Sequence, residues 1–203
     1  MTLCSRPLPL FPACSSRKVQ VDFEGGHVSS DGGVLLVRQA DRKLGLTARL
    51  AKILGDRRRQ ASCDHDLETL LRQRIYGLAL GYEDLNDHDT LRHDVALQTA
   101  TGTDQALASA STLCRWENRA DRKTAWQIAE WMVDQFIQSY KTPPEEVILD
   151  FDATDDAVHG KQEGRFFHGY YDQYCFLPLY VFCGDQLLVS YLRPSHIDSA
   201  RHA

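Results

Sequence analysis

The sequence contains 203 residues, of which 43% are hydrophobic and 25% charged, and its formal net charge is −5 at pH 7. This composition excludes a disordered chain and a protein made of long membrane-spanning segments, and it predicts one or two globular domains. The short N-terminal apolar run is interrupted by Pro7, Pro9 and Pro12, so it does not predict a signal peptide and we expect a cytoplasmic protein. The six cysteines include no C-x-x-C pair, so we expect reduced thiols and no structural zinc site.

The negative charge is concentrated in the C-terminal part of the chain. Residues 141–203 contain five lysines and arginines but ten aspartates and glutamates, whereas the preceding residues are balanced. A metal-dependent enzyme that acts on phosphodiesters has this kind of distribution, because acidic residues gather where cations bind and basic patches elsewhere hold phosphate. The distribution permits a nucleic-acid partner without requiring one.

The first elements are a short hairpin and a helical region. Alternating residues from Val19 to Phe23 predict a strand that turns at Gly25-Gly26, so residues 1–33 form a Pro-rich start with a small hairpin. Apolar residues at helical spacing follow from Val34 to Leu54, with a break at Gly45. A leucine stripe predicts a core helix over residues 67–80.

Residues 81–94 are rich in aspartate and histidine, which raises the question of a metal site. His88 and His93 are five positions apart, which is poor spacing for one face of a helix, and Asp89 is well placed to cap the turn at residues 90–93. We therefore expect a structural role for this segment. A long amphipathic helix is predicted over residues 125–140, and Pro143-Pro144 ends it and marks the expected domain boundary.

Basic residues follow the first helices and surround a later one. They are candidates for DNA binding, and the alternative is a solvated helix face, which is the commoner role of charge runs. A helix over residues 111–118 could contact DNA or could pack through Trp116. The candidate DNA-binding residues are Arg57, Arg58, Arg59, Arg115, Arg119 and Lys123.

An acidic strand is predicted over residues 147–153, within the acidic stretch 147–156. Three apolar residues lead into Asp150 and Asp152, which lie two positions apart and therefore share one face of a strand. Neighbouring carboxylates at the end of a buried strand favour a hard cation such as Mg²⁺, which prefers oxygen ligands. The alternative is a solvated turn with side-chain caps over residues 152–156.

Two further strands, joined by a turn, are predicted after the acidic strand. Residues 174–183 and 186–192 predict a hairpin with its turn at Gly184-Asp185, and a new helix is expected to begin near Pro194. The polar loop over residues 159–165 lacks the spacing of a phosphate-binding Walker A loop, so Lys161 does not indicate nucleotide binding.

Several of these segments together resemble insertion-sequence transposases of the DDE type. The similarity lies in D-F-D-A-T at residues 150–154, V-H-G-K-Q-E-G at 158–164 and the hairpin. It extends upstream to Q-R-I-Y-G-L-A-L-G-Y-E-D-L-N-D-H-D-T-L-R at 73–92 and S-T-L-C-R-W-E-N at 111–118. The resemblance thus covers nearly the whole chain.

The resemblance implies an α+β fold. A mainly helical N-terminal region, residues 34–142, would contribute to DNA binding, and residues 143–203 would begin an RNase H-like catalytic domain with its first three antiparallel strands. It also implies metal-dependent phosphodiester cleavage and strand transfer at transposon ends, with Mg²⁺ or Mn²⁺ as cofactor. In the family pattern the acid two residues before the threonine is catalytic, which assigns that role to Asp152, with Asp150 as an additional metal ligand.

The sequence departs from the family by lacking the second aspartate and the final glutamate of the DDE triad. We therefore expect a truncated, inactive N-terminal fragment with an incomplete sheet. Its partners would be double-stranded DNA and, through the unpaired sheet edge, a further copy of the chain as a homo-oligomer, with no membrane partner.

Two other interpretations remain open. A non-enzymatic DNA-binding or oligomerising remnant fits the same sequence. The D-x-D-x-T pattern also resembles haloacid-dehalogenase-type phosphatases, in which Asp150 would be the nucleophile and Asp152 the general acid. That fold requires a helix soon after the motif, whereas the sequence predicts a loop and a hairpin.

Overall fold

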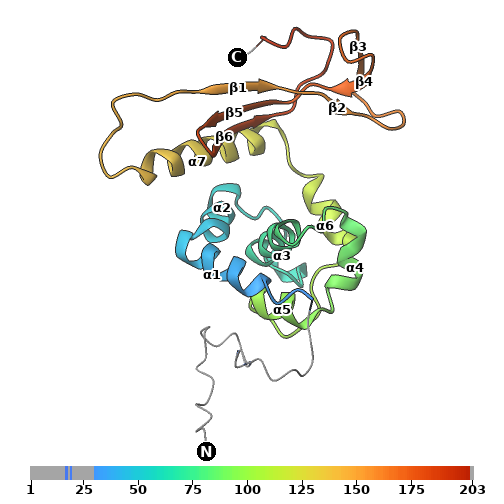
Figure 1. Cartoon of the computed structure of the whole chain (residues 1–203). Helices are drawn as coiled ribbons and strands as arrows, with labels where there is room; N and C mark the ends of the chain where they lie inside the picture. The colour runs from blue at the N-terminus through green and yellow to red at the C-terminus, as the bar shows by residue number, and fades with distance from the viewer. Residues whose placement is uncertain (1–16, 18, 20–29, 202–203) are drawn as a thin grey trace, which may run out of the picture. The chain divides into compact units, whose positions relative to one another are not determined.

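The structure is a computed structural model that describes residues 17, 19 and 30–201, and it forms two compact units (Figure 1). We call the described residues up to Ala120 the helical unit and those from Asp121 the strand unit. The hairpin expected over residues 19–29 lies, apart from Val19, outside the described part. The long helix at the start of the strand unit packs on a strand of that unit, and the domain boundary expected at Pro143-Pro144 stays a prediction.

Short capped helices build the helical unit. Gly45 has a φ of 65°, which a residue with a side chain rarely adopts, and it separates the first two helices at the predicted break. Asp66 and Asp94 cap two later helices by accepting hydrogen bonds from Thr69 N and Leu97 N, both at 2.7 Å. The helices are α1 Val34–Leu44, α2 Leu46–Leu54, α3 Leu67–Ala79, α4 His88–Leu91, α5 Val95–Thr101 and α6 Ala110–Glu117, with the short 3₁₀ turns η1 Gln60–Ser62 and η2 Leu85–Asp87.

The interior of the helical unit contains two apolar clusters around α3. The larger joins α1, α3 and α5, and its fully buried members include Val34, Tyr76 and Leu97. The smaller joins α3 to α6 through Leu70 and Leu113. The predicted leucine stripe is thus confirmed as core over most of its length, whereas Leu78 near the end of α3 is exposed.

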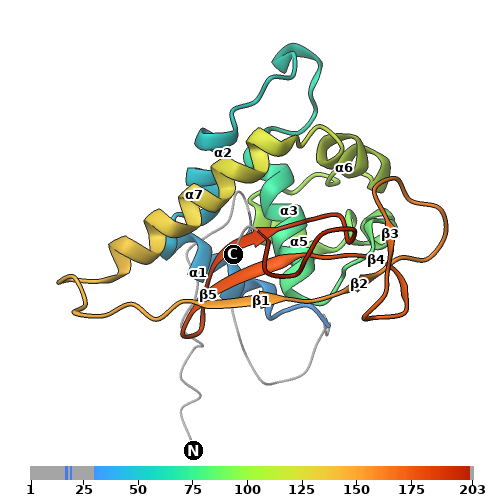
Figure 2. The ribbon, with the colours of Figure 1, turned by 90° about the horizontal axis from the view of Figure 1, so that it is seen from above.

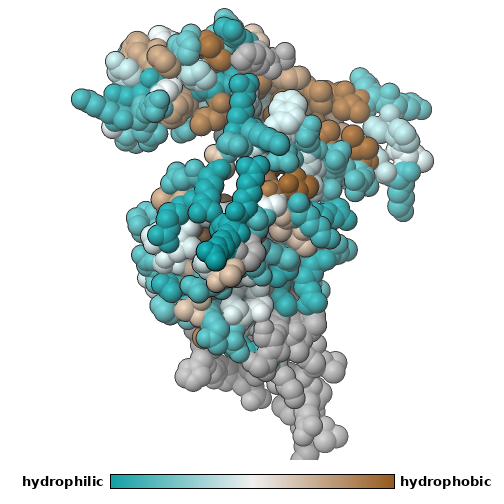
Figure 3. Space-filling view, turned by 180° about the vertical axis from the view of Figure 1, so that it is seen from behind, coloured by the Kyte–Doolittle hydropathy of each residue, from teal (hydrophilic) through white to brown (hydrophobic). Residues whose placement is uncertain are grey.

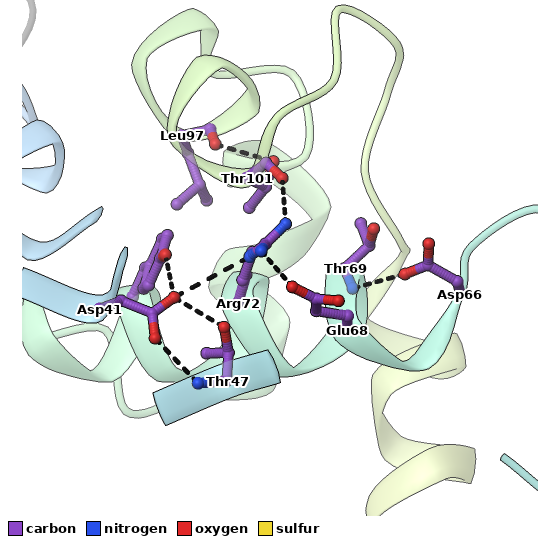
Figure 4. A network of polar contacts seen from close by, with 9 residues as sticks. Asp41, Thr47, Asp66, Glu68, Thr69, Arg72, Leu97 and Thr101 are labelled. Atoms are coloured by element: carbon purple, nitrogen blue, oxygen red, sulfur yellow. Dashed lines mark hydrogen bonds and ion pairs between the residues drawn. The ribbon is translucent and has the colours of Figure 1, made fainter. Parts of the chain in front are cut away.

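A buried carboxylate links α1, α2 and α3 (Figure 4). Asp41 is only 7% exposed and accepts hydrogen bonds from Thr47 N at 2.8 Å, from Thr47 Oγ1 at 2.6 Å and from Tyr76 Oη at 2.6 Å. Arg72 Nε lies 3.9 Å from the same carboxylate. A buried charge is tolerated only when its oxygens are satisfied in this way, so these contacts fix the three helices relative to one another.

The histidine- and aspartate-rich segment has structural roles, as expected. His88 is fully buried, with its Nδ1 3.3 Å from Gln73 Nε2, while His93 is exposed. Asp89 accepts a hydrogen bond from Ala110 N at 3.0 Å, so it caps the start of α6 instead of the turn at 90–93. The segment therefore ties α4 to α3 and α6.

The strand unit combines one helix with two small antiparallel sheets. Helix α7, Arg122–Ser139, packs against β6 on one side of the first sheet (Figure 2). That sheet has the order β1 Asp150–Ala153, β5 Leu179–Cys183, β6 Gln186–Tyr191, and the second has the order β2 Asp156–Ala157, β4 Gln173–Phe176, β3 Phe166–His168. The chain is thus α+β as predicted, with a three-stranded antiparallel sheet that begins at the Asp150 strand.

The predicted acidic strand is shorter than expected. Asp150 pairs with Phe182, which puts Leu149 opposite Cys183, the last residue of β5, so residues before Leu149 run past the end of their partner strand. Residues 147–149 are exposed and outside any strand, where a buried strand was predicted. Strand β1 also forms one edge of its sheet.

The predicted strand over residues 174–183 is two strands in different sheets. Leu177 and Pro178 separate β4 from β5, and proline has no N–H to donate to a ladder. After Asp156 the described residues form strands and turns, which is not the helix that the phosphatase interpretation requires. Residues 194–201 form turns where a helix was expected. No helix in the described part of the chain has the length and apolar character needed to cross a membrane.

Candidate functional site

Asp152 lies in a cavity of the strand unit of about 630 Å³, which we call the Asp152 cavity. Strand β1 positions Asp152 opposite Tyr180, and the turn that follows β3 and the segment near the C-terminus supply the other walls. The cavity is lined by Phe151, Asp152, Ala153, His168, Tyr170, Tyr171, Leu179, Asp198, Ser199 and Ala200.

The two predicted metal ligands occupy different surroundings. Both Asp150 and Asp152 are exposed on β1, so burial does not oblige a cation to neutralise them as the sequence argument assumed. Asp152 lines the cavity and Asp150 does not. A second carboxylate, Asp198, reaches the cavity from forty-six positions further along the chain, and no sequence pattern indicated it.

Arg193 holds the segment that carries Asp198. Its side chain is 1% exposed, and Nε donates a hydrogen bond to the carbonyl of Leu177 at 2.9 Å. Its Nη1 donates to the carbonyls of Ser199, at 3.2 Å, and Arg201. Because buried donors keep these partners, the turn over residues 194–201 is fixed beside the cavity.

The Asp152 cavity offers the type of ligand that a hard divalent cation prefers, but it offers too few of these ligands. Carboxylate oxygens from Asp152 and Asp198 are the ligands that Mg²⁺ and Mn²⁺ prefer. Within residues 30–201, however, no group of three His, Cys, Asp or Glu side chains is arranged to hold a metal ion. A two-metal centre would therefore require further carboxylates.

A second cavity, of about 640 Å³, lies entirely within the helical unit and is strongly basic. We call it the arginine cavity. It is lined by Arg57, Arg58, Arg59, Ser62, Cys63, Asp64, His65, Arg92, Ser109, Thr112, Arg115, Trp116 and Arg119. The segment between α2 and α3 meets α6 there, so arginines from two distant parts of the sequence are brought together.

Most of these cations lack an acidic partner. Within the described residues, Arg58 alone among the six arginines forms an ion pair, with both its Nε and Nη2 on Asp56, at 2.8 and 2.5 Å. Arg115 Nη2 donates to Thr112 Oγ1 at 3.1 Å. Arg92 Nε is buried without any hydrogen-bond partner. An unsatisfied buried donor beside several unneutralised cations favours an anionic ligand.

The pKa of His65 responds to the positive charge of the arginine cavity. Burial lowers its pKa, and the neighbouring Arg92 and Arg58 lower it further, against Asp64 and Asp66, which favour the charged form. An anion in the cavity would oppose the effect of the arginines and raise that pKa. The imidazole is therefore neutral at physiological pH and becomes easier to protonate when an anion binds.

Five of the six predicted DNA-binding residues line this one cavity, and Lys123 does not, because it lies on α7 in the strand unit. Sequence analysis missed Arg92 and His65 and left Trp116 undecided between packing and DNA contact. In the structure Trp116 packs against the Leu70–Leu113 cluster and also lines the cavity. A signal for Arg92 existed, since it ends the segment 73–92 that carries the family resemblance.

The chain was also compared with known proteins. A family model described as "Transposase DDE domain group 1" matches residues 11–203, which is nearly the whole sequence. No curated protein matches the chain, and no solved structure matches it.

Proposed function

The chain belongs to the transposase DDE domain group 1 family, and on that premise we propose that it takes part in the transposition of an insertion sequence. In this proposal Asp152 is the first metal-binding carboxylate of the catalytic site, and the arginine cavity contacts the phosphates of double-stranded DNA at the transposon ends. The observation that carries the proposal is the family match across both units, together with Asp152 on the first strand of an antiparallel sheet.

The proposed catalytic domain is RNase H-like. Strands β1, β5 and β6 are antiparallel neighbours in the order expected for the first three strands of that fold, and this supports the assignment. Bound Mg²⁺ or Mn²⁺ would activate the attacking oxygen and stabilise the leaving oxygen of a phosphodiester. Asp152 would supply carboxylate oxygens from an exposed strand, where a DNA backbone can approach, and Asp150 would lie beside it on the same face.

We propose that residues 1–203 alone do not cleave DNA. Asp152 and Asp198 give the Asp152 cavity two carboxylates, which is fewer than the three that a two-metal centre of this class uses. A cation with so few protein ligands keeps most of its water and binds weakly. The second aspartate and final glutamate of the triad would have to come from residues outside this sequence.

The test of catalysis is nicking of supercoiled plasmid DNA with Mg²⁺ or Mn²⁺, using the purified chain and its Asp152→Asn variant. We expect no nicking by either protein, because the donor set is incomplete. Metal-dependent nicking by the unmodified chain that disappears in the variant would show that this sequence supplies the missing ligands, and the proposal of an inactive fragment would fall.

The DNA-binding part of the proposal rests on electrostatics. Cations that bind phosphates release condensed counterions, so affinity for duplex DNA should fall steeply as salt concentration rises. Removing two phosphate contacts by Arg57→Ala and Arg59→Ala should reduce the salt slope by about two. The matched control is Lys141→Ala, which removes an exposed charge after α7, and Lys123→Ala tests whether α7 also contacts DNA. Salt-independent binding would contradict the proposal.

A non-enzymatic role is the second candidate, because one observation favours it. The arginine cavity lies wholly within the compact helical unit and requires no metal. The chain could therefore bind DNA in the cytoplasm without cutting it, and the exposed β1 edge could pair with another copy of the chain as a homo-oligomer. DNA binding without nicking, combined with a concentration-dependent molecular mass, would support this role over catalysis.

A further inference from the structure

We propose that the arginine cavity holds an unpaired nucleotide of a DNA strand, with its phosphate on the arginines and its base on Trp116. The inference rests on the proposal that this cavity binds DNA, and it adds the form of the DNA that is recognised. A strand end, a frayed end or a single-stranded extension would present such a nucleotide.

The shape of the site favours one unpaired nucleotide over a duplex surface. A duplex is recognised by elements that project into its grooves, whereas the arginines here line a hollow of about 640 Å³. Concave sites of about 300–1,000 Å³ are the size that encloses small organic ligands. A single nucleotide fits this range, whereas a double helix would present only its backbone phosphates to the arginines at the mouth of the cavity.

Trp116 provides an apolar wall in an otherwise charged site. The tryptophan packs against the cluster of Leu70, Ala108 and Leu113, and its side chain is also part of the cavity lining. Its position is therefore fixed by the core. A fixed aromatic ring beside cations is the arrangement on which bases of single strands stack, because every base has an aromatic face.

The remaining lining groups suit the polar parts of a nucleotide. Arg92 Nε is a buried donor that lacks a partner, and Arg57, Arg59 and Arg119 carry charges with no acidic partner among the described residues. A phosphate would satisfy these groups. Hydroxyl groups of Ser109 and Thr112 and the carboxylate of Asp64 add donors and acceptors for a base edge.

The experiment measures the affinity of the full chain for two fluorescent DNAs of the same sequence, one blunt duplex and one duplex with a short thymidine extension. We expect the extended DNA to bind about tenfold more tightly, which is the typical contribution of stacking one base on an aromatic side chain. Equal affinity for the two DNAs would overturn the inference.

Variants assign the preference to Trp116. Trp116→Leu keeps an apolar group against the core and should bring the ratio of the affinities for the extended and the blunt DNA down to about one. Trp126→Leu is the matched control, since Trp126 is an exposed tryptophan on α7, and it should keep the preference. If Trp116→Leu does not fold by circular dichroism, Trp116→Phe replaces it, and that variant should retain most of the preference. Loss of preference in the Trp126 variant instead would overturn the assignment.

Competition separates a nucleotide site from a simple phosphate site. Thymidine 5′-monophosphate should displace the extended DNA at lower concentration than inorganic phosphate does, because only the nucleotide carries a base. Equal competition would show that Trp116 contributes nothing. Salt-dependent binding of both DNAs without any preference would defeat this inference alone, whereas failure of the chain to bind either DNA would defeat the proposed function as well.

Discussion

The helical unit and the strand unit differ in how completely they bury their large apolar side chains. In the helical unit the apolar residues of α1, α3 and α5 form a closed cluster, and the buried Asp41 carboxylate has its oxygens satisfied. In the strand unit large apolar residues remain exposed before β1 and along β3 and β4, and hydrophobic surface is visible on it in Figure 3. We infer that specific interior contacts stabilise the helical unit, while the strand unit presents apolar surface for association.

The largest expected effect is the loss of the Asp41 carboxylate. Asp41→Ala leaves Thr47 N–H and the Tyr76 hydroxyl without acceptors in the interior, and we expect a loss of about 3 kcal/mol in the free energy of unfolding. Urea denaturation followed by circular dichroism measures this. The matched control is Asp134→Ala, which removes an exposed carboxylate from α7 and should change stability by less than about 0.5 kcal/mol. Similar losses in both variants would contradict the inference that specific interior contacts stabilise the helical unit.

The next effect concerns the contact between α3 and His88. A Cβ atom at Gly77 would lie 2.8 Å from His88 Cε1, closer than atoms can approach, so Gly77→Ala must displace the buried imidazole. Although alanine is the better helix residue, we expect a net loss of about 1–2 kcal/mol. Gly33→Ala is the control, since nothing lies within 4 Å of its added Cβ. An increase in stability for Gly77→Ala would show that the helical unit tolerates repacking.

A smaller effect is the pH dependence of the helical unit. Burial lowers the pKa of His88, and Arg74 lowers it further against nearby carboxylates. The unfolded chain therefore binds a proton at a higher pH than the folded chain does. The contribution of His88 to the free energy of unfolding is fully present above about pH 6.5 and decreases as the pH drops below that value. Thermal unfolding between neutral and mildly acidic pH should show this slope. The dependence of thermal stability on pH should weaken in His88→Gln and persist in the control variant His93→Gln. The lowered pKa of His65 should also make the protein less stable as the pH drops.

The smallest expected effect on stability lies in the strand unit. Ile148 is 73% exposed before β1, so Ile148→Lys should change the free energy of unfolding by less than about 0.5 kcal/mol. Self-association measured by light scattering should nevertheless decrease, because a lysine next to an edge strand opposes pairing with another chain. A large loss of stability would mean that residues 147–149 are packed in solution, and the contrast between the units would disappear.

Local patterns predicted most of the elements. The break at Gly45, the leucine core of α3, the helix at residues 111–118 and the turn at Gly184-Asp185 follow from backbone preferences and periodicity that act over a few residues. The family resemblance, which the family match confirms, likewise depends on short stretches of sequence. The alternation that places Asp150 and Asp152 on one face is a local property of any strand.

Pairing and assembly were decided by tertiary structure. Whether residues 147–149 join a strand depends on where β5 ends, and the separation of β4 from β5 depends on which partners each finds. The Asp152 cavity gains Asp198 only because Arg193 anchors a distant turn. The arginine cavity likewise unites Arg57 with Arg92 and Arg119. The sequence by itself determined the helices, the turns and the family, because these depend on neighbouring residues, whereas side chains far apart in the chain meet only through long-range packing.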